Sequence, residues 1–133
     1  MIVADTNLIA YLLVRGQHTG EAEAVYHKDP QWGAPLLWRS EFRNVLVFYL
    51  RRRLIRLEEA LDTMEQAEWL MRGQEFEVES SRVLRLAATS GCSAYDCEFV
   101  ALARDLGVPL VTSDRGLIAK FEPAVVSMQA FCS

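Results

Sequence analysis

The chain has few cysteines, no long apolar run and no basic leader. Its three cysteines, Cys92, Cys97 and Cys132, are odd in number and lack the short paired spacing of a zinc site, so we expect no disulfide framework. A reducing, cytoplasmic compartment fits this usage best. No stretch approaches the roughly 18 apolar residues of a membrane span, and the sequence passes directly into the apolar run that begins at Ile2. We therefore expect neither export nor a membrane anchor.

Positive charge is also scarce. The net charge is −4, and only Lys28 and Lys120 of the 14 basic residues are lysines. This balance argues against a protein that coats nucleic acid through a global basic field, because no such field exists here. A local patch of arginines, which bind phosphate well, remains compatible with it.

The chain alternates short apolar runs with helical patterns. Its 133 residues, 51% of them hydrophobic, are a usual size for one domain, so we expect a single domain over residues 1–133. We expect strands at 2–4, 32–35, 76–78, 108–112 and 125–126, and helices at 8–15, 18–28, 36–53, 57–71, 79–88, 95–106 and 117–121. This order predicts an α/β fold with a central parallel sheet of four to five short strands and helices on both faces.

Acidic residues recur where such a sheet would form a crevice. Asp5 and Asp114 each follow a strand, Asp96 stands near a helix start, and Glu41 lies on the apolar stripe of the third helix. Because the strands are parallel, their carboxyl ends share one edge, where ligands bind in open sheets. Taken singly, each aspartate is explained as well by helix capping. Glu41 is different, since a carboxylate on an apolar stripe needs a compensating charge.

Several carboxylates in one crevice repel one another unless a hard cation joins them. An all-oxygen set suits Mg²⁺ or Mn²⁺, and such an ion supports hydrolysis of a phosphodiester. Thr6, Asn7 and Ser113 add neutral polar groups beside the acids. They could orient a carboxylate or a phosphate oxygen, or serve only as turn and cap residues.

These residues carry a family resemblance. The start MIVADTN, the inward Glu41 and the stretch SAYDCEFVALARDLGVPLVTSDRGL resemble a PIN domain, and the whole length is similar to the VapC-type toxin ribonucleases of bacterial toxin–antitoxin pairs. The resemblance implies a PIN-like three-layer α/β/α fold and an endoribonuclease that depends on Mg²⁺ or Mn²⁺. It further implies that Asp5, Glu41, Asp96 and Asp114 form the acidic metal-binding quartet, with Thr6, Asn7 and Ser113 in support. A cognate antitoxin and a homodimer are also implied.

Two further expectations concern partners. Since a guanidinium can neutralise carboxylates as a metal does, we expect the antitoxin to insert an arginine near the acids. Some relatives carry another acid shortly after the last aspartate, whereas here Arg115, Gly116 and Leu117 follow Asp114, so a second metal would be held weakly or recruited only with RNA. The runner-up interpretation is a PIN-like module that binds RNA or a protein partner without cutting.

Arginines along the third helix are candidates for contacts with the RNA backbone. They are Arg39, Arg43, Arg51 and Arg52. A solvated helix end explains the same residues without any function. We expect Trp38 and Trp69 to pack in the interior because both fall on helix stripes, and we expect Glu98 to be solvated.

Overall fold

The computed structural model describes residues 1–133 and contains one five-stranded sheet whose strands are all parallel. The strands are β1 (Ile2–Ala4), β2 (Trp32–Pro35), β3 (Glu75–Phe76), β4 (Leu110–Val111) and β5 (Val125–Val126), in the order β3-β2-β1-β4-β5. In the central register Val3 lies opposite Gly33 on one side and Leu110 on the other. The sequence predicted this fold class correctly, with β3 displaced by one residue from the predicted run.

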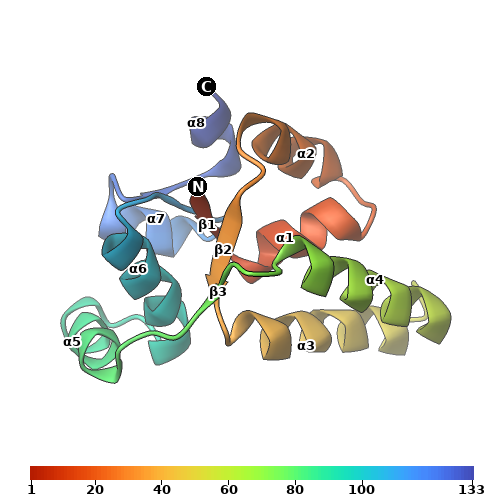
Figure 1. Cartoon of the computed structure of the whole chain (residues 1–133), viewed down its shortest axis with the longest axis horizontal. Coiled ribbons are helices and arrows are strands. Elements are labelled where there is room, and N and C mark those ends of the chain that lie inside the picture. The colour runs from red at the N-terminus through yellow and green to blue at the C-terminus, as the bar shows by residue number, and fades with distance from the viewer.

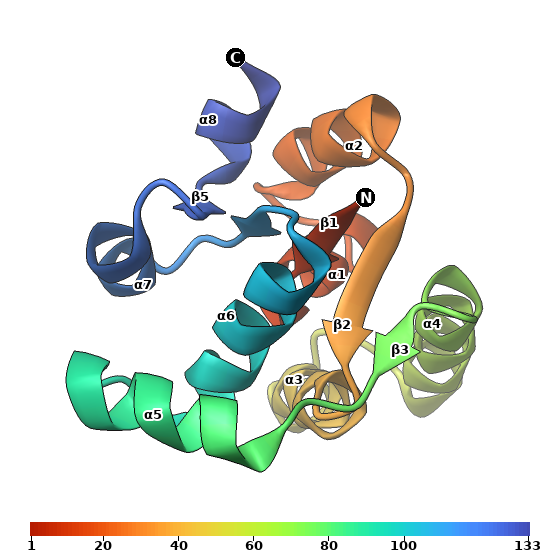
Figure 2. The same cartoon turned by 60° about the vertical axis from the view of Figure 1, so that its left-hand side comes forward.

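Helices cover both faces of the sheet. They are α1 (Thr6–Leu13), α2 (Thr19–Lys28), α3 (Trp38–Arg51), α4 (Leu57–Leu70), α5 (Ser80–Ser90), α6 (Ala94–Leu106), α7 (Arg115–Phe121) and α8 (Met128–Cys132). In both views α5 and α6 lie on one side of the sheet, and α1, α2 and α4 lie on the other (Figures 1 and 2). Helix α6 contacts β1, β2 and β4 directly. The last helix, α8, was not predicted, and no helix of the structure is long and apolar enough to cross a membrane.

The helix boundaries follow from local residue chemistry. Asp5, Ser93 and Asp114 cap α1, α6 and α7 with their side chains, which accept hydrogen bonds from backbone N–H groups that would otherwise have no partner. Gly91 and Gly107 end α5 and α6 in the left-handed conformation, with φ of 73° and 66°. Each helix start that follows β1 or β4 therefore lies at the carboxyl edge of the sheet.

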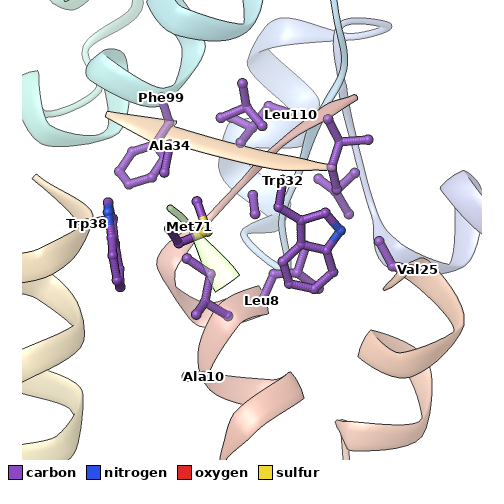
Figure 3. Packing of buried hydrophobic residues seen from close by; sticks show 14 of the residues in the cluster. Leu8, Ala10, Val25, Trp32, Ala34, Trp38, Met71, Phe99 and Leu110 are labelled. Atoms are coloured by element: carbon purple, nitrogen blue, oxygen red, sulfur yellow. The ribbon is translucent and has the colours of Figure 1, made fainter. Parts of the chain in front are cut away.

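The core lies between the sheet and its helical layers. Trp32 of β2, Leu8 of α1 and Met71 after α4 are fully or almost fully buried and pack together (Figure 3). Trp38 is also fully buried, as predicted. Trp69, however, is 71% exposed, so the prediction that it packs in the interior is wrong. It lies on α4 at the periphery of the fold, where no further element covers its stripe.

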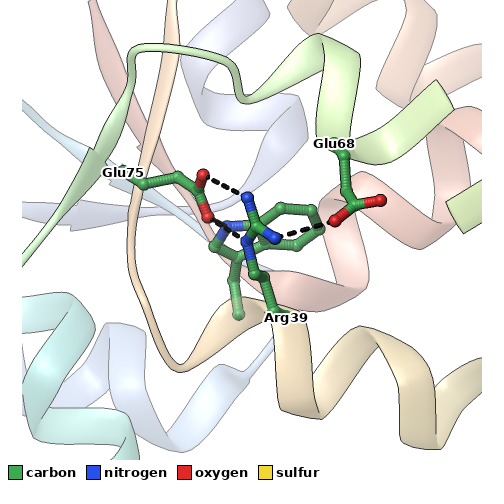
Figure 4. A network of polar contacts seen from close by, with 4 residues as sticks. Arg39, Glu68 and Glu75 are labelled. Atoms are coloured by element: carbon green, nitrogen blue, oxygen red, sulfur yellow. Dashed lines mark hydrogen bonds and ion pairs between the residues drawn. The ribbon is translucent and has the colours of Figure 1, made fainter. Parts of the chain in front are cut away.

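An ion-pair network ties α3 to the edge strand and to α4. The guanidinium of Arg39 donates from Nε and Nη2 to the two carboxylate oxygens of Glu75, at 2.6 and 2.8 Å, and from Nη1 to Glu68 at 2.7 Å (Figure 4). The indole Nε1 of Trp38 donates to the same Glu75 carboxylate at 2.8 Å. The two-residue strand β3 is thus held beside the start of α3 by side chains as well as by its ladder.

Candidate active site

Asp5 is the most buried acid at the carboxyl edge. It follows β1 directly, and its Oδ1 accepts a hydrogen bond from the backbone N–H of Thr6 at 2.7 Å. Its Oδ2 accepts a hydrogen bond from the hydroxyl of Thr112 at 2.5 Å, although the two residues are 107 positions apart. Burial raises the pKa of Asp5, and the charges of Asp96 and Asp114 raise it further.

Glu41 reaches the same place from the first turn of α3. Its Oε1 accepts a hydrogen bond from the hydroxyl of Thr6 at 2.7 Å, so Thr6 contacts both Asp5 and Glu41. Burial raises the pKa of Glu41, and the negative charges of Asp5, Asp96 and Glu98 add to that effect. A buried carboxylate on an apolar stripe would require a nearby cation, and no Arg or Lys side chain forms an ion pair with Glu41. Its charged neighbours are other acids instead.

Asp96 and Asp114 complete the set from α6 and from the end of β4. Burial raises the pKa of Asp96, and the charge of Asp114 is the next cause. The Oδ1 atom of Asp114 accepts a hydrogen bond from the N–H of Leu117 at 3.0 Å, and its own N–H donates to the hydroxyl of Thr112 at 3.1 Å. The charge of Asp114 therefore acts on Asp5 and Asp96, and the charges of Asp5 and Asp96 act on Glu41. We call Asp5, Glu41, Asp96 and Asp114 the acidic cluster.

The donors of the acidic cluster suit a hard divalent cation. They are carboxylate oxygens, partly desolvated at Asp5, Glu41 and Asp96, and their mutual repulsion is what such an ion relieves. No group of three or more His, Cys, Asp or Glu side chains lies close enough to form a finished metal cage. The cluster is an open set of carboxylates whose chemistry fits Mg²⁺ or Mn²⁺.

The supporting polar residues differ in their contacts. Thr6 bridges two acids, whereas Asn7 is exposed on α1. Ser113 is exposed too, and its Oγ lies 3.4 Å from the hydroxyl of Tyr11. Sequence reasoning missed Thr112, which is fully buried and joins Asp5 to the backbone of Asp114. The available signal was its place two residues before Asp114, at the end of an apolar run.

Glu98 lies closer to the acidic cluster than the sequence predicted. We predicted a solvated side chain, but Glu98 is half-buried, burial raises its pKa, and its charge acts on Glu41. It lines a groove of about 460 Å³ together with apolar residues that include Leu36 and Leu84.

The arginines predicted to contact RNA fall into two groups. Arg39 is committed to Glu68 and Glu75, which leaves its guanidinium poorly placed to receive a phosphate. Arg43 and Arg51 are exposed and have no ion pair, and the guanidinium of Arg52 lies 4.1 Å from the ring centroid of Phe48. The RNA contacts of all four stay predictions, and Arg39 is the weakest of them.

The parallel sheet with an acidic cluster at its carboxyl edge defines the class of this protein. A PIN domain is matched over residues 2–121, and the chain belongs to the PIN-domain family. It is 33% identical over 131 residues to Ribonuclease VapC3 of Pyrobaculum aerophilum, an alignment that covers 95% of this chain and 98% of that protein.

Solved structures share the fold at lower identity. PAE2754 from Pyrobaculum aerophilum superposes with a TM-score of 0.72 at 22% identity and covers 98% of this chain and 85% of its own. A toxin–antitoxin complex from Klebsiella pneumoniae superposes with a TM-score of 0.72 at 20% identity, covering 96% of this chain and 98% of its own. FitAcB from Neisseria gonorrhoeae has the same TM-score and identity, with 97% and 99% covered. These likenesses establish the architecture.

Proposed function

We propose that this protein is a cytoplasmic endoribonuclease that depends on Mg²⁺ or Mn²⁺ and acts as the toxin of a toxin–antitoxin pair. The observation that carries the proposal is the acidic cluster, in which Asp5, Glu41, Asp96 and Asp114 meet at the carboxyl edge of the sheet from four separate segments. The related ribonuclease supports the substrate class, because the two chains align over almost their whole lengths.

Asp5, Asp96 and Asp114, with Glu41, would hold the ion. When bound, it would neutralise the negative charge that builds up on a phosphate during hydrolysis. Thr112 fixes the orientation of Asp5, and its contact with the backbone fixes Asp114 relative to it. Since Oε1 of Glu41 accepts the Thr6 hydroxyl, its Oε2 is the oxygen that would hold the ion or orient an attacking water.

The test is RNA cleavage under controlled metal supply. Purified protein is incubated with structured RNAs in Mg²⁺, in Mn²⁺ and in EDTA, beside Asp96→Asn and the control Asp62→Asn, whose residue is exposed on α4. We expect cleavage only with metal, its loss in Asp96→Asn and its retention in the control. Cleavage in EDTA, or full activity of Asp96→Asn, would refute the mechanism. RNA binding without any cleavage would favour the non-cutting module instead.

An antitoxin needs a surface, and the structure offers an apolar groove at the periphery. The groove has a volume of about 770 Å³ and lies between α1, α2 and α4, where Leu12, Leu13, Tyr26, Trp69 and Leu70 line it. The exposed indole of Trp69 is the kind of aromatic anchor that binding sites favour. We propose that the antitoxin docks here and extends an arginine to the acidic cluster.

The partner proposal is tested by co-expression. We expect Trp69→Ala to weaken capture of the neighbouring gene product while RNA cleavage by the free protein is unchanged. We also expect growth arrest on expression of this chain alone, relieved by the neighbouring gene. Arrest that this gene fails to relieve would count against the toxin role.

We also propose that two copies of the chain associate through a second groove, the one of about 460 Å³ that Leu36, Leu84 and Glu98 line. Leu36 is 48% exposed and Leu84 is 64% exposed, and Tyr95 of α6 is 63% exposed. Burial of such side chains stabilises association because it removes apolar area from water. Leu84→Glu should shift the mass measured by light scattering from dimer to monomer, and a wild-type monomer at high concentration would exclude this dimer.

A further inference from the structure

Arginines line a depression at the junction of α5 and α6, on the side of the sheet away from α1 and α4. Arg82, Arg85 and Thr89 of α5 face Arg104 and Asp105 of α6 across a hollow of about 350 Å³. In Figure 2 α5 crosses below α6, and α7 lies beside them. We call this hollow the arginine depression.

The positive charge of the arginine depression is only partly compensated. Arg82 pairs with Asp105 and with Glu79. Arg85 and Arg104 have no carboxylate within ion-pair distance, although the Arg104 guanidinium lies 5.5 Å from the ring centroid of Phe121. Two guanidinium groups thus keep free N–H donors around a hollow, in a protein whose net charge is −4.

The arginine depression and the acidic cluster are connected by α6 and α7. Asp96 is in the first turn of α6, and Arg104 follows eight positions later, which corresponds to about 12 Å along a helix. Asp114 caps the start of α7, and Phe121, at the end of α7, contacts Arg104. A chain held at the acids and running along α6 and α7 would therefore arrive at the arginines.

We propose that the arginine depression is a phosphate-binding subsite for the RNA strand, a few nucleotides from the bond that is cut. This inference rests on the proposed ribonuclease function. Free guanidinium groups favour phosphate oxygens, which they can bind through two parallel hydrogen bonds. Lys120 extends the same path, because its Nζ donates to the carbonyl of Ser90 at 2.8 Å, just before the loop that leads to Asp96. The subsite differs from the Arg51–Arg52 patch predicted from the sequence.

The experiment compares substrates of two lengths. Cleavage is measured for a single-stranded RNA of about 20 nucleotides and for a dinucleotide without terminal phosphates, whose one phosphodiester lies at the acids and leaves no phosphate for the arginine depression. The proteins are wild type, Arg85→Gln, Arg85→Lys and Arg51→Gln, the last of which tests the competing patch on α3. For Arg85→Gln on the long RNA we expect KM to rise about tenfold, the effect of losing one hydrogen bond to a charged group, with kcat unchanged. On the short RNA we expect no change.

The affinity for RNA should also depend on salt concentration, in part through the charge of Arg85. Loss of one phosphate contact should lower the slope of log Kd against log salt by about 0.7 for a single strand, as measured by fluorescence anisotropy in EDTA. Arg85→Lys should recover most of the slope, and Arg104→Gln should reproduce the loss seen in Arg85→Gln.

The outcomes separate the subsite from the proposed function. An unchanged KM and slope for Arg85→Gln on the long RNA would overturn the subsite, as would an equal loss on both lengths. If the wild type cuts no RNA, the ribonuclease proposal fails, and the anisotropy slopes still decide whether this surface holds phosphates. A larger effect of Arg51→Gln than of Arg85→Gln would assign the RNA path to α3 instead.

Discussion

Replacing Thr112 with valine should test how the acidic cluster is organised. Thr112 is fully buried, its hydroxyl donates to Oδ2 of Asp5 at 2.5 Å, and it accepts the N–H of Asp114 at 3.1 Å. Valine has nearly the same shape, so Thr112→Val removes the two hydrogen bonds with little change in packing. The variant isolates the hydroxyl from the rest of the side chain.

The expected loss of stability follows from the kind of hydrogen bond. A bond to an ionised carboxylate contributes about 1.5–3 kcal/mol. The bond from the N–H of Asp114 is part-buried, and because Asp114 as a residue is exposed, we expect water to replace the lost acceptor at a smaller cost. The added methyl group of valine offsets part of this, because it buries more apolar area. We expect Thr112→Val to lower the free energy of unfolding by about 2 kcal/mol at neutral pH.

The effect should depend on pH in a defined direction. The Thr112 hydroxyl lowers the pKa of Asp5, opposing the burial that raises it, so its loss raises that pKa further. The hydroxyl therefore stabilises the ionised carboxylate more than the protonated one. The difference in unfolding free energy between wild type and Thr112→Val should shrink as pH falls through the pKa of Asp5.

The matched control is Thr112→Ser, which keeps the hydroxyl and loses one buried methyl group, at a cost of about 1 kcal/mol. In urea unfolding the serine variant should lose less than the valine variant. In metal-dependent cleavage the valine variant should lose about 10–100-fold in kcat/KM, as partners of metal ligands commonly do, and the serine variant little. If the two variants behave alike in both assays, the hydroxyl does not organise the site.

Further predictions concern the charges and the surface. In metal-free buffer at pH 7, Asp96→Asn should raise the Tm, because burial and the charge of Asp114 raise the pKa of Asp96 and so make its ionised form costly in the folded protein. This cost exists only when the carboxyl is ionised, so the gain in Tm should vanish as the pH falls below the ordinary pKa of 3.8. Mg²⁺ should raise the Tm of the wild type, and equal shifts in Asp96→Asn would contradict its role as a ligand. Arg39→Gln should lower the free energy of unfolding by about 1–2 kcal/mol, since Glu75 is mostly buried while Arg39 is partly solvated; an unchanged urea midpoint would show that the network adds nothing. Trp69→Ala should leave the Tm of the free protein within error, because the indole is 71% exposed, and a large drop would mean that it packs in solution.

Much of the fold could be predicted because short, local sequence patterns determine most of its strands and helices. The apolar run 2–4, followed by a capping Asp5, and the run that ends before Asp114 each contain a strand, a cap and a helix start within about ten residues. The positions of these two acids at one edge then follow from parallel strands alone. Glu41 was found for a similar local reason, since its charge interrupts an apolar stripe.

What could not be predicted depends on contacts between distant segments. Nothing near Thr112 in the sequence indicates that its hydroxyl meets Asp5, and nothing near Arg39 indicates the carboxylate of Glu75, 36 positions away. Trp69 was misplaced because a helical stripe shows which side chains share a face and not whether another element covers that face. Glu98 was misjudged for the converse reason, since residues of α5, the end of β3 and Leu36 line a groove around a side chain that its helix alone would leave in water.

Capping and catalysis, which compete as explanations of an aspartate in a sequence, are compatible in this structure. Asp114 uses Oδ1 to accept the N–H of Leu117, which fixes its χ angles and leaves Oδ2 without a protein donor. A carboxylate held by one oxygen and open at the other is preorganised for a cation without the cost of ordering it on binding. In the proposed metal site, the capping hydrogen bonds would therefore help to hold these carboxylates in place while their charges repel.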